Sequence, residues 1–86
     1  MKALIFTDKH SAFNSELQSL LHELNRRHMA LNQVDMNSRN GSSQAQLYDV
    51  MSAPAVVLTR DDGAPVASWR HSIPRPDDVT YQMGFI

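Results

Sequence analysis

The spacing of apolar residues in the first third of the chain predicts a buried strand followed by an amphipathic helix. The run Lys2–Thr7 is rich in strand formers and is followed by a polar stretch at residues 8–11. From there, apolar side chains recur at the three- and four-residue spacing of a helix with one buried stripe: Phe13, Leu17, Leu20, Leu21 and Leu24. We expect this helix to span residues 11–27, with Ser11 or Asn14 capping its start.

The remaining chain predicts alternating short elements. A second strand begins at Met29 and leads into a polar tract at residues 37–43, and a short helix follows over residues 43–51. That helix is expected to turn four side chains to the sheet: Ala45, Leu47, Tyr48 and Met51. Strands at residues 55–59 and 66–69 flank a hairpin turn at Asp61-Asp62-Gly63, and Pro76 begins a final helix. Because strand–helix–strand connections give parallel pairs and a hairpin gives an antiparallel pair, the sheet should be mixed.

Composition narrows the class of protein. The 86 residues are 42% hydrophobic and 20% charged, which is typical of one small globular domain spanning residues 1–86. The formal net charge is −1 and the basic residues are scattered apart from the Arg26-Arg27 pair, so nucleic acid is not a favoured partner. We recognise neither a signal peptide nor a membrane span, and we therefore expect a cytoplasmic protein with no membrane partner.

The order of these elements and the tract at residues 48–58 both resemble those of a known protein superfamily. The tract Tyr-Asp-Val-Met-Ser-Ala-Pro-Ala-Val-Val-Leu resembles the cis-proline segment of the thioredoxin-like superfamily, with Asp49 at a position that is usually Gly and Met51 at a usually polar one. The resemblance implies an α/β, thioredoxin-like fold of order βαβαββα, with a four-stranded mixed sheet flanked by helices. It also implies a cis peptide bond before Pro54, which would form one wall of a peptide-binding groove.

The family's redox chemistry is excluded, because the chain contains no cysteine. Aligned with the glutaredoxin branch, residues 11–14 (Ser-Ala-Phe-Asn) occupy the place of the Cys-x-x-Cys motif. Ser11 cannot replace a thiolate, since an unactivated hydroxyl stays protonated at neutral pH. The adjacent Asp8, His10 and Ser11 are not expected to converge as a catalytic triad. We therefore expect a protein that is not an enzyme and has no catalytic residue and no cofactor.

Histidines offer a second possible chemistry, a metal site. They lie at positions 10, 22, 28 and 71, without a pair at ligand spacing. Solvated side chains, with His28 as a charge at the end of the first helix, explain these positions without a metal. We expect no metal site.

The leading hypothesis is a binding module for a protein or peptide partner. Its predicted groove joins the start of the first helix to the proline tract and is formed by Lys9, His10, Ser11, Ala12, Phe13, Asn14, Ser52, Ala53 and Pro54. One alternative is a transferase-like protein that binds glutathione or a small ligand, with Ser11 or His10 orienting a thiol substrate. The resemblance implies that Lys9 and either Asp77 or Asp78 would correspond to the glutathione-binding residues of glutaredoxins. The other alternative is a structural homodimer completed by the final helix and the apolar tail at residues 83–86.

Overall fold

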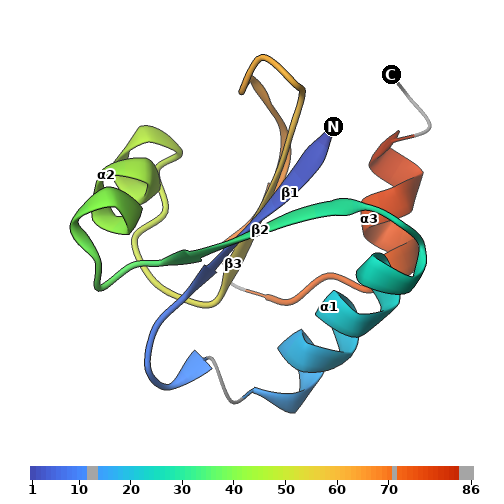
Figure 1. Cartoon of the computed structure of the whole chain (residues 1–86), viewed down its shortest axis with the longest axis horizontal. Coiled ribbons are helices and arrows are strands. Elements are labelled where there is room, and N and C mark those ends of the chain that lie inside the picture. The colour runs from blue at the N-terminus through green and yellow to red at the C-terminus, as the bar shows by residue number, and fades with distance from the viewer. Residues whose placement is uncertain (12–13, 71, 84–86) are drawn as a thin grey trace.

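The expected order of strands and helices is present in the structure, a computed structural model that describes residues 1–11, 14–70 and 72–83 (Figure 1). Within these ranges the α/β order βαβαββα is confirmed. In chain order the elements are β1 (Lys2–Thr7), α1 (Ser15–Arg26), β2 (Ala30–Asp35), α2 (Arg39–Leu47), β3 (Ala55–Thr59), β4 (Pro65–Trp69) and α3 (Pro76–Met83).

The four strands form one mixed sheet in the order β2-β1-β3-β4. β1 pairs in parallel with β2 and antiparallel with β3, and β3 pairs antiparallel with β4, as the connections predict. The central strands are the most apolar, and every residue of β3 is buried. β2 and β4 form the two edges. A register irregularity between Leu58 and Thr59 interrupts the β3–β4 ladder.

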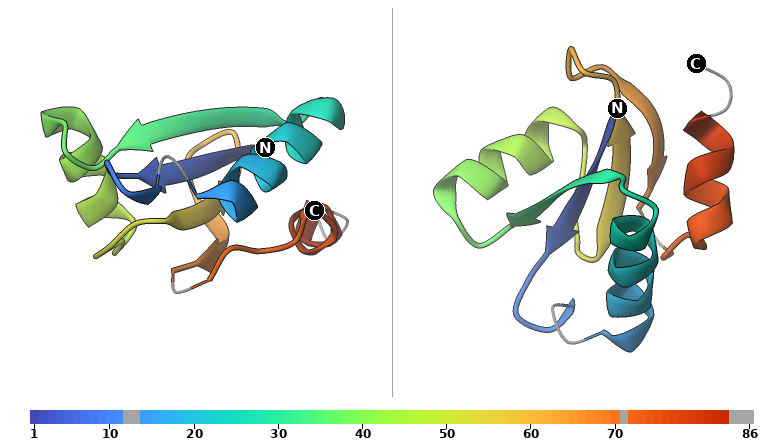
Figure 2. Two further views of the ribbon diagram at one scale, coloured as in Figure 1. Left: turned by 90° about the horizontal axis from the view of Figure 1, so that it is seen from below. Right: turned by 45° about the vertical axis from the view of Figure 1, so that its right-hand side comes forward.

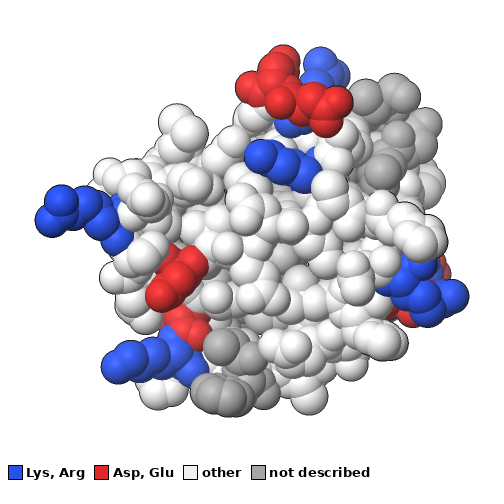
Figure 3. All heavy atoms as spheres, viewed as in Figure 1, with Lys and Arg blue, Asp and Glu red and all other residues white. Residues whose placement is uncertain are grey.

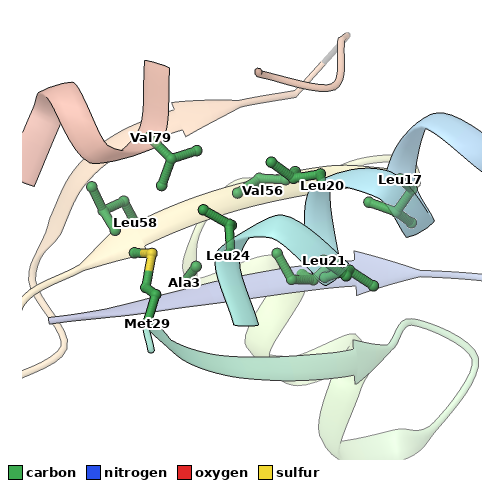
Figure 4. Packing of buried hydrophobic residues seen from close by; sticks show 10 residues of the cluster. Ala3, Leu17, Leu20, Leu21, Leu24, Met29, Val56, Leu58 and Val79 are labelled. Atoms are coloured by element: carbon green, nitrogen blue, oxygen red, sulfur yellow. The ribbon is translucent and has the colours of Figure 1, made fainter. Parts of the chain in front are cut away.

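Two hydrophobic clusters cover opposite faces of the sheet, because successive side chains of a strand point to opposite sides. On one face Ala3 and Ile5 of β1 lie under α1 and α3, together with the apolar stripe of α1 (Figure 4). On the other face Leu4 and Phe6 lie under the α2 side, where Ala45 joins them. Figure 2 shows the resulting layers, with α2 on one side of the sheet and α1 and α3 on the other.

The first helix begins at Ser15, so the expectation of a start at residue 11 is wrong. Asn14 is the N-cap, and its Oδ1 accepts a hydrogen bond of 3.0 Å from the Leu17 N–H. Ser11 cannot cap α1, because its hydroxyl already accepts from the Asp8 N–H at 2.8 Å and closes a separate turn. The predicted apolar stripe is present: Leu17, Leu20, Leu21 and Leu24 are all buried.

The second helix starts and ends four residues earlier than expected. Ser38 caps α2, and its Oγ accepts from the Gly41 N–H at 2.9 Å. The helix ends at Leu47, and Asp49 then takes a left-handed conformation with φ of 58°. Leu47 is 75% exposed and Met51 is 91% exposed, so the expectation that both face the sheet is wrong. Met51 lies beyond the end of the helix, and Leu47 is about 200° around the helix axis from the buried Ala45, so neither side chain faces the sheet.

Candidate functional site

A hollow of about 340 Å³ lies where the start of α1, the segment before β3 and the segment after β4 meet. Its lining residues come from these three parts of the chain: Asn14 and Glu16, then Ser52, Ala53 and Pro54, and finally Arg70, Ser72 and Ile73. The structure therefore brings together four of the residues expected in the groove, Asn14, Ser52, Ala53 and Pro54, and adds a wall after β4.

The segment at residues 52–54 is held in place by the anchors that precede it. Val50 is buried, and its N–H donates to the Ala45 carbonyl at 2.8 Å. Tyr48 packs its ring against Phe6 and donates its hydroxyl to the Gly63 carbonyl at 2.8 Å, which ties the end of α2 to the β3–β4 hairpin. The positive φ of Asp49 turns the chain between these anchors, a conformation that Gly adopts without strain.

Ser52 and Ala53 leave their backbone open at the hollow. The Ala53–Pro54 peptide bond is cis, and regular strand pairing begins only at Ala55. Within the described part of the chain, neither the N–H nor the C=O of Ser52 or Ala53 has a hydrogen-bond partner. An extended ligand could satisfy these groups by adding a strand.

The wall at Arg70, Ser72 and Ile73 was not expected from the sequence. It follows β4 directly, and neither spacing nor residue type distinguishes it from an ordinary loop. The signal that the resemblance offered lay further along the chain, at Asp77 or Asp78. The wall also adds a positive charge to the hollow, because Arg70 belongs to it. Glu16, from α1, lines the same hollow, and neither side chain has an ion-pair partner among the described residues.

Ser11 serves a structural turn and does not open into the hollow. Its backbone N–H donates to Asp8 Oδ1 at 2.8 Å, and the His10 N–H donates to the same oxygen at 3.0 Å. The Ser11 N–H, and then its hydroxyl, hold the pKa of the Asp8 carboxyl below its usual value. Because Ser11 is buried and its hydroxyl is bound to the backbone, it has no geometry for nucleophilic attack.

The other predicted groove residues lie elsewhere. Lys9 and His10 line a separate hollow of about 380 Å³ with Asp8 and Asn37. Ala12 and Phe13 fall outside the described residues. The predicted groove therefore corresponds to two separate hollows in the structure. Asn14 and Pro54 line one of them, and Lys9 and His10 line the other.

The residues suggested for glutathione are not gathered at one site. Lys9 lies at the second hollow, whereas Asp77 pairs with Arg27 at 3.0 Å and Asp78 accepts from the Arg75 N–H at 3.2 Å at the start of α3. The apolar tail suggested for self-association also lies largely outside the described residues, at 84–86.

Neither a metal-binding cluster nor a membrane-spanning helix occurs in the described ranges. No group of three or more His, Asp or Glu side chains is close enough there to hold a metal ion. None of the helices in residues 1–11, 14–70 and 72–83 combines the length and hydrophobicity needed to cross a membrane. On the face shown in Figure 3, Lys and Arg side chains are dispersed toward the border.

Comparison with solved structures places this geometry in a known fold. Thioredoxin 1 from Thermosipho africanus TCF52B matches 99% of this chain and 92% of its own length at 14% identity, with a TM-score of 0.73. Thioredoxin-2 from a malaria parasite matches 95% of this chain and 80% of its own, at 19% identity and a TM-score of 0.74. A thioredoxin-fold protein from Helicobacter pylori matches 98% and 67%, at 17% identity and 0.62. No family model and no curated relative matches the sequence.

Proposed function

Because the chain has the thioredoxin fold and contains no cysteine, we propose that it is a binding module without redox or other enzymatic activity. Its ligand is an extended segment of a peptide or protein, held in the hollow between Asn14, the Ser52–Pro54 segment and the wall after β4. The observation that carries this proposal is the open backbone of Ser52 and Ala53 on the border of that hollow.

Main-chain recognition fits the shape and chemistry of the hollow. An extended ligand beside Ser52 and Ala53 would exchange backbone hydrogen bonds with them, which provides affinity with little dependence on sequence. Ile73 offers an apolar contact from the opposite wall, and the hydroxyls of Ser52 and Ser72 can donate or accept. A binding function of this kind needs neither a thiol nor a general base.

Charge adds a preference for the side chains of the ligand. Glu16 and Arg70 line the hollow from different elements, and neither is neutralised by a described partner. A peptide with a carboxylate toward Arg70 and a basic group toward Glu16 would complement both. Arg70→Glu should therefore weaken binding of acidic peptides and strengthen binding of basic ones at low salt.

The test is a peptide array, followed by calorimetric titration of the peptides that bind. Ser52 is exposed, so Ser52→Trp should fold normally and block the hollow, and we expect at least a tenfold loss of affinity, about 1.4 kcal/mol. Ser43→Trp, at an exposed position of α2, is the matched control and should leave affinity unchanged. Equal binding by both variants would show that the ligand sits elsewhere, and an array without ligands would contradict the proposed function.

A further inference from the structure

The two edges of the sheet differ in how they are protected against pairing with another strand. β4 begins with Pro65, which has no N–H to donate, and its ladder is interrupted by the irregularity at Leu58 and Thr59. Proline and bulges are devices by which edge strands avoid pairing. β2 has no proline, no bulge and no lysine, and it is uncharged from Ala30 to Val34. Among the described strands, β2 is therefore the unprotected edge.

The direction of the β2 backbone follows from one hydrogen bond at its end. The Met36 N–H donates to the Thr7 carbonyl at 2.9 Å, so residue 36 turns its backbone groups toward β1. Because these groups alternate along a strand, the even positions of β2 face β1, and Leu31 and Gln33 turn theirs outward. The left panel of Figure 2 shows β2 along the outer border of the sheet, with no described strand beyond it.

Internal contacts close this edge at both ends. The Met29 N–H is already donated to the Leu24 carbonyl at 3.1 Å. At the other end, the Asp35 carbonyl accepts from the Ser38 N–H at 3.1 Å and from the Ser38 hydroxyl at 2.7 Å. Among the described residues, nothing pairs with the outward N–H and C=O groups of Leu31 and Gln33, so complete pairs of open donors and acceptors remain there.

We infer that β2 pairs antiparallel with β2 of a second copy of this chain, about a two-fold axis at Asn32. In this register Leu31 of each copy lies opposite Gln33 of the other, so their open N–H and C=O groups satisfy one another. Shifting the axis to Gln33 would place Leu31 opposite Asp35, whose carbonyl is already occupied. Asn32 then lies opposite Asn32 of the second copy, at a non-hydrogen-bonded position where side chains come closest. The two side-chain amides can hydrogen-bond to each other, because an amide both donates and accepts.

Charge supports a second copy as the occupant. Figure 3, viewed with β2 toward the reader as in Figure 1, shows a broad uncharged area at the centre of this face with charged groups near its border. In this register Asp35 at the end of one β2 lies opposite Met29 of the other copy, so the two Asp35 carboxylates are at opposite ends of the interface. No charged residue of β2 therefore faces itself.

The dimer would also cover a further hollow, which lies between β2 and α1. Leu31 and Gln33 line a space of about 350 Å³ with residues on the adjacent side of α1: Gln18, Leu21, His22 and Asn25. Because β2 is a single six-residue strand, the interface is small and the dimer should be weak and exchange rapidly. This proposal is independent of the peptide hollow, which lies at the start of α1 and beside Pro54.

Charge reversal at the axis tests the proposal. Asn32 is exposed, so Asn32→Asp and Asn32→Lys should fold as the parent does, and each places like charges directly opposite one another. By analytical ultracentrifugation at millimolar concentration, we expect the parent to dimerise, each variant alone to be monomeric, and an equal mixture of the two to dimerise again. Asn40→Asp and Asn40→Lys, at an exposed position of α2, are the matched controls and should dimerise like the parent.

The result that supports the proposal is this reciprocal rescue, with concentration-dependent protection of the Leu31 and Gln33 amides from hydrogen exchange. A monomeric parent at millimolar concentration would overturn it. So would dimerisation that persists in Asn32→Asp alone, because the contact would then lie on another surface, such as the C-terminal tail. Binding of an array peptide that competes with dimerisation would instead identify a heterologous strand as the occupant of this edge.

Discussion

Gly41 in α2 lies directly against the carbonyl oxygen of Asp35 at the end of β2: a Cβ on Gly41 would lie 1.8 Å from that oxygen. The same carbonyl accepts from both the backbone and the hydroxyl of Ser38, the cap of α2. The close approach therefore joins the end of an edge strand to the start of the helix that covers one face of the sheet.

Gly41→Ala should destabilise the fold, although Ala is the better helix former. The backbone at Asp35 cannot yield without breaking its bonds to Ser38, so we expect a loss of about 2 kcal/mol in the free energy of unfolding. Urea denaturation measures it. Ser42→Ala, at the exposed neighbouring position of the same helix, should be neutral or slightly stabilising. Equal stability of the two variants would mean that the Asp35–Gly41 contact is not maintained.

Asp49 tests the positive φ between α2 and the Pro54 segment. With φ of 58°, a Cβ is unfavourable at this position, so Asp49→Gly should be more stable than Asp49→Ala by about 1 kcal/mol. At Ser43, inside α2, the order of the corresponding Gly and Ala variants should reverse. Thermal or urea unfolding of the four variants compares them, and the same order at both sites would contradict the left-handed conformation.

Asn14 tests which residue begins α1. Loss of its side-chain acceptor in Asn14→Ala should cost about 1 kcal/mol of stability and reduce helix content, whereas Asn14→Asp retains the cap and should stay close to the parent. Urea denaturation and far-ultraviolet circular dichroism provide the two measurements. Loss of stability in Asn14→Asp equal to that in Asn14→Ala would argue against capping.

Glu23 should make the stability of the fold depend on acid pH. Hydrogen bonds from Arg26, and then from Arg27, lower the pKa of Glu23 from 4.5 to about 2. A carboxyl group with a lowered folded-state pKa stabilises the fold above its unfolded-state pKa. This contribution is lost as the pH falls from about 4.5 toward 2.

The measurement is urea denaturation of the parent and Glu23→Gln at neutral pH and near pH 2. The difference in stability between the two proteins should be larger at neutral pH and should shrink in acid. Because the ion pairs lie at the surface, added salt should also reduce it. Glu16→Gln, which removes a carboxylate without an ion pair among the described residues, is the matched control for the loss of one charge. A constant difference for Glu23→Gln would contradict its coupling to Arg26 and Arg27.

Local sequence patterns determined the larger part of the fold. The run Lys2–Thr7, the leucine stripe of α1 and the Asp-Asp-Gly turn each specify an element through side-chain period or turn chemistry, and the element order then leaves few topologies. The absence of cysteine is enough by itself to exclude thiol chemistry. The proline tract also pointed to Ser52, Ala53 and Pro54 as one side of a groove.

The tertiary structure decided the features that depend on contacts between distant segments. The start of α2 is set by Ser38 and by the fit of Gly41 against Asp35, so Leu47 and Met51 point outward despite being apolar. Ser11 is withdrawn from the groove because Asp8 binds it in a closed turn. The wall at Arg70, Ser72 and Ile73 exists because β4 ends beside the start of α1. A local pattern records the conformation of neighbouring residues, whereas a hollow or an open edge is created by the way separate elements pack.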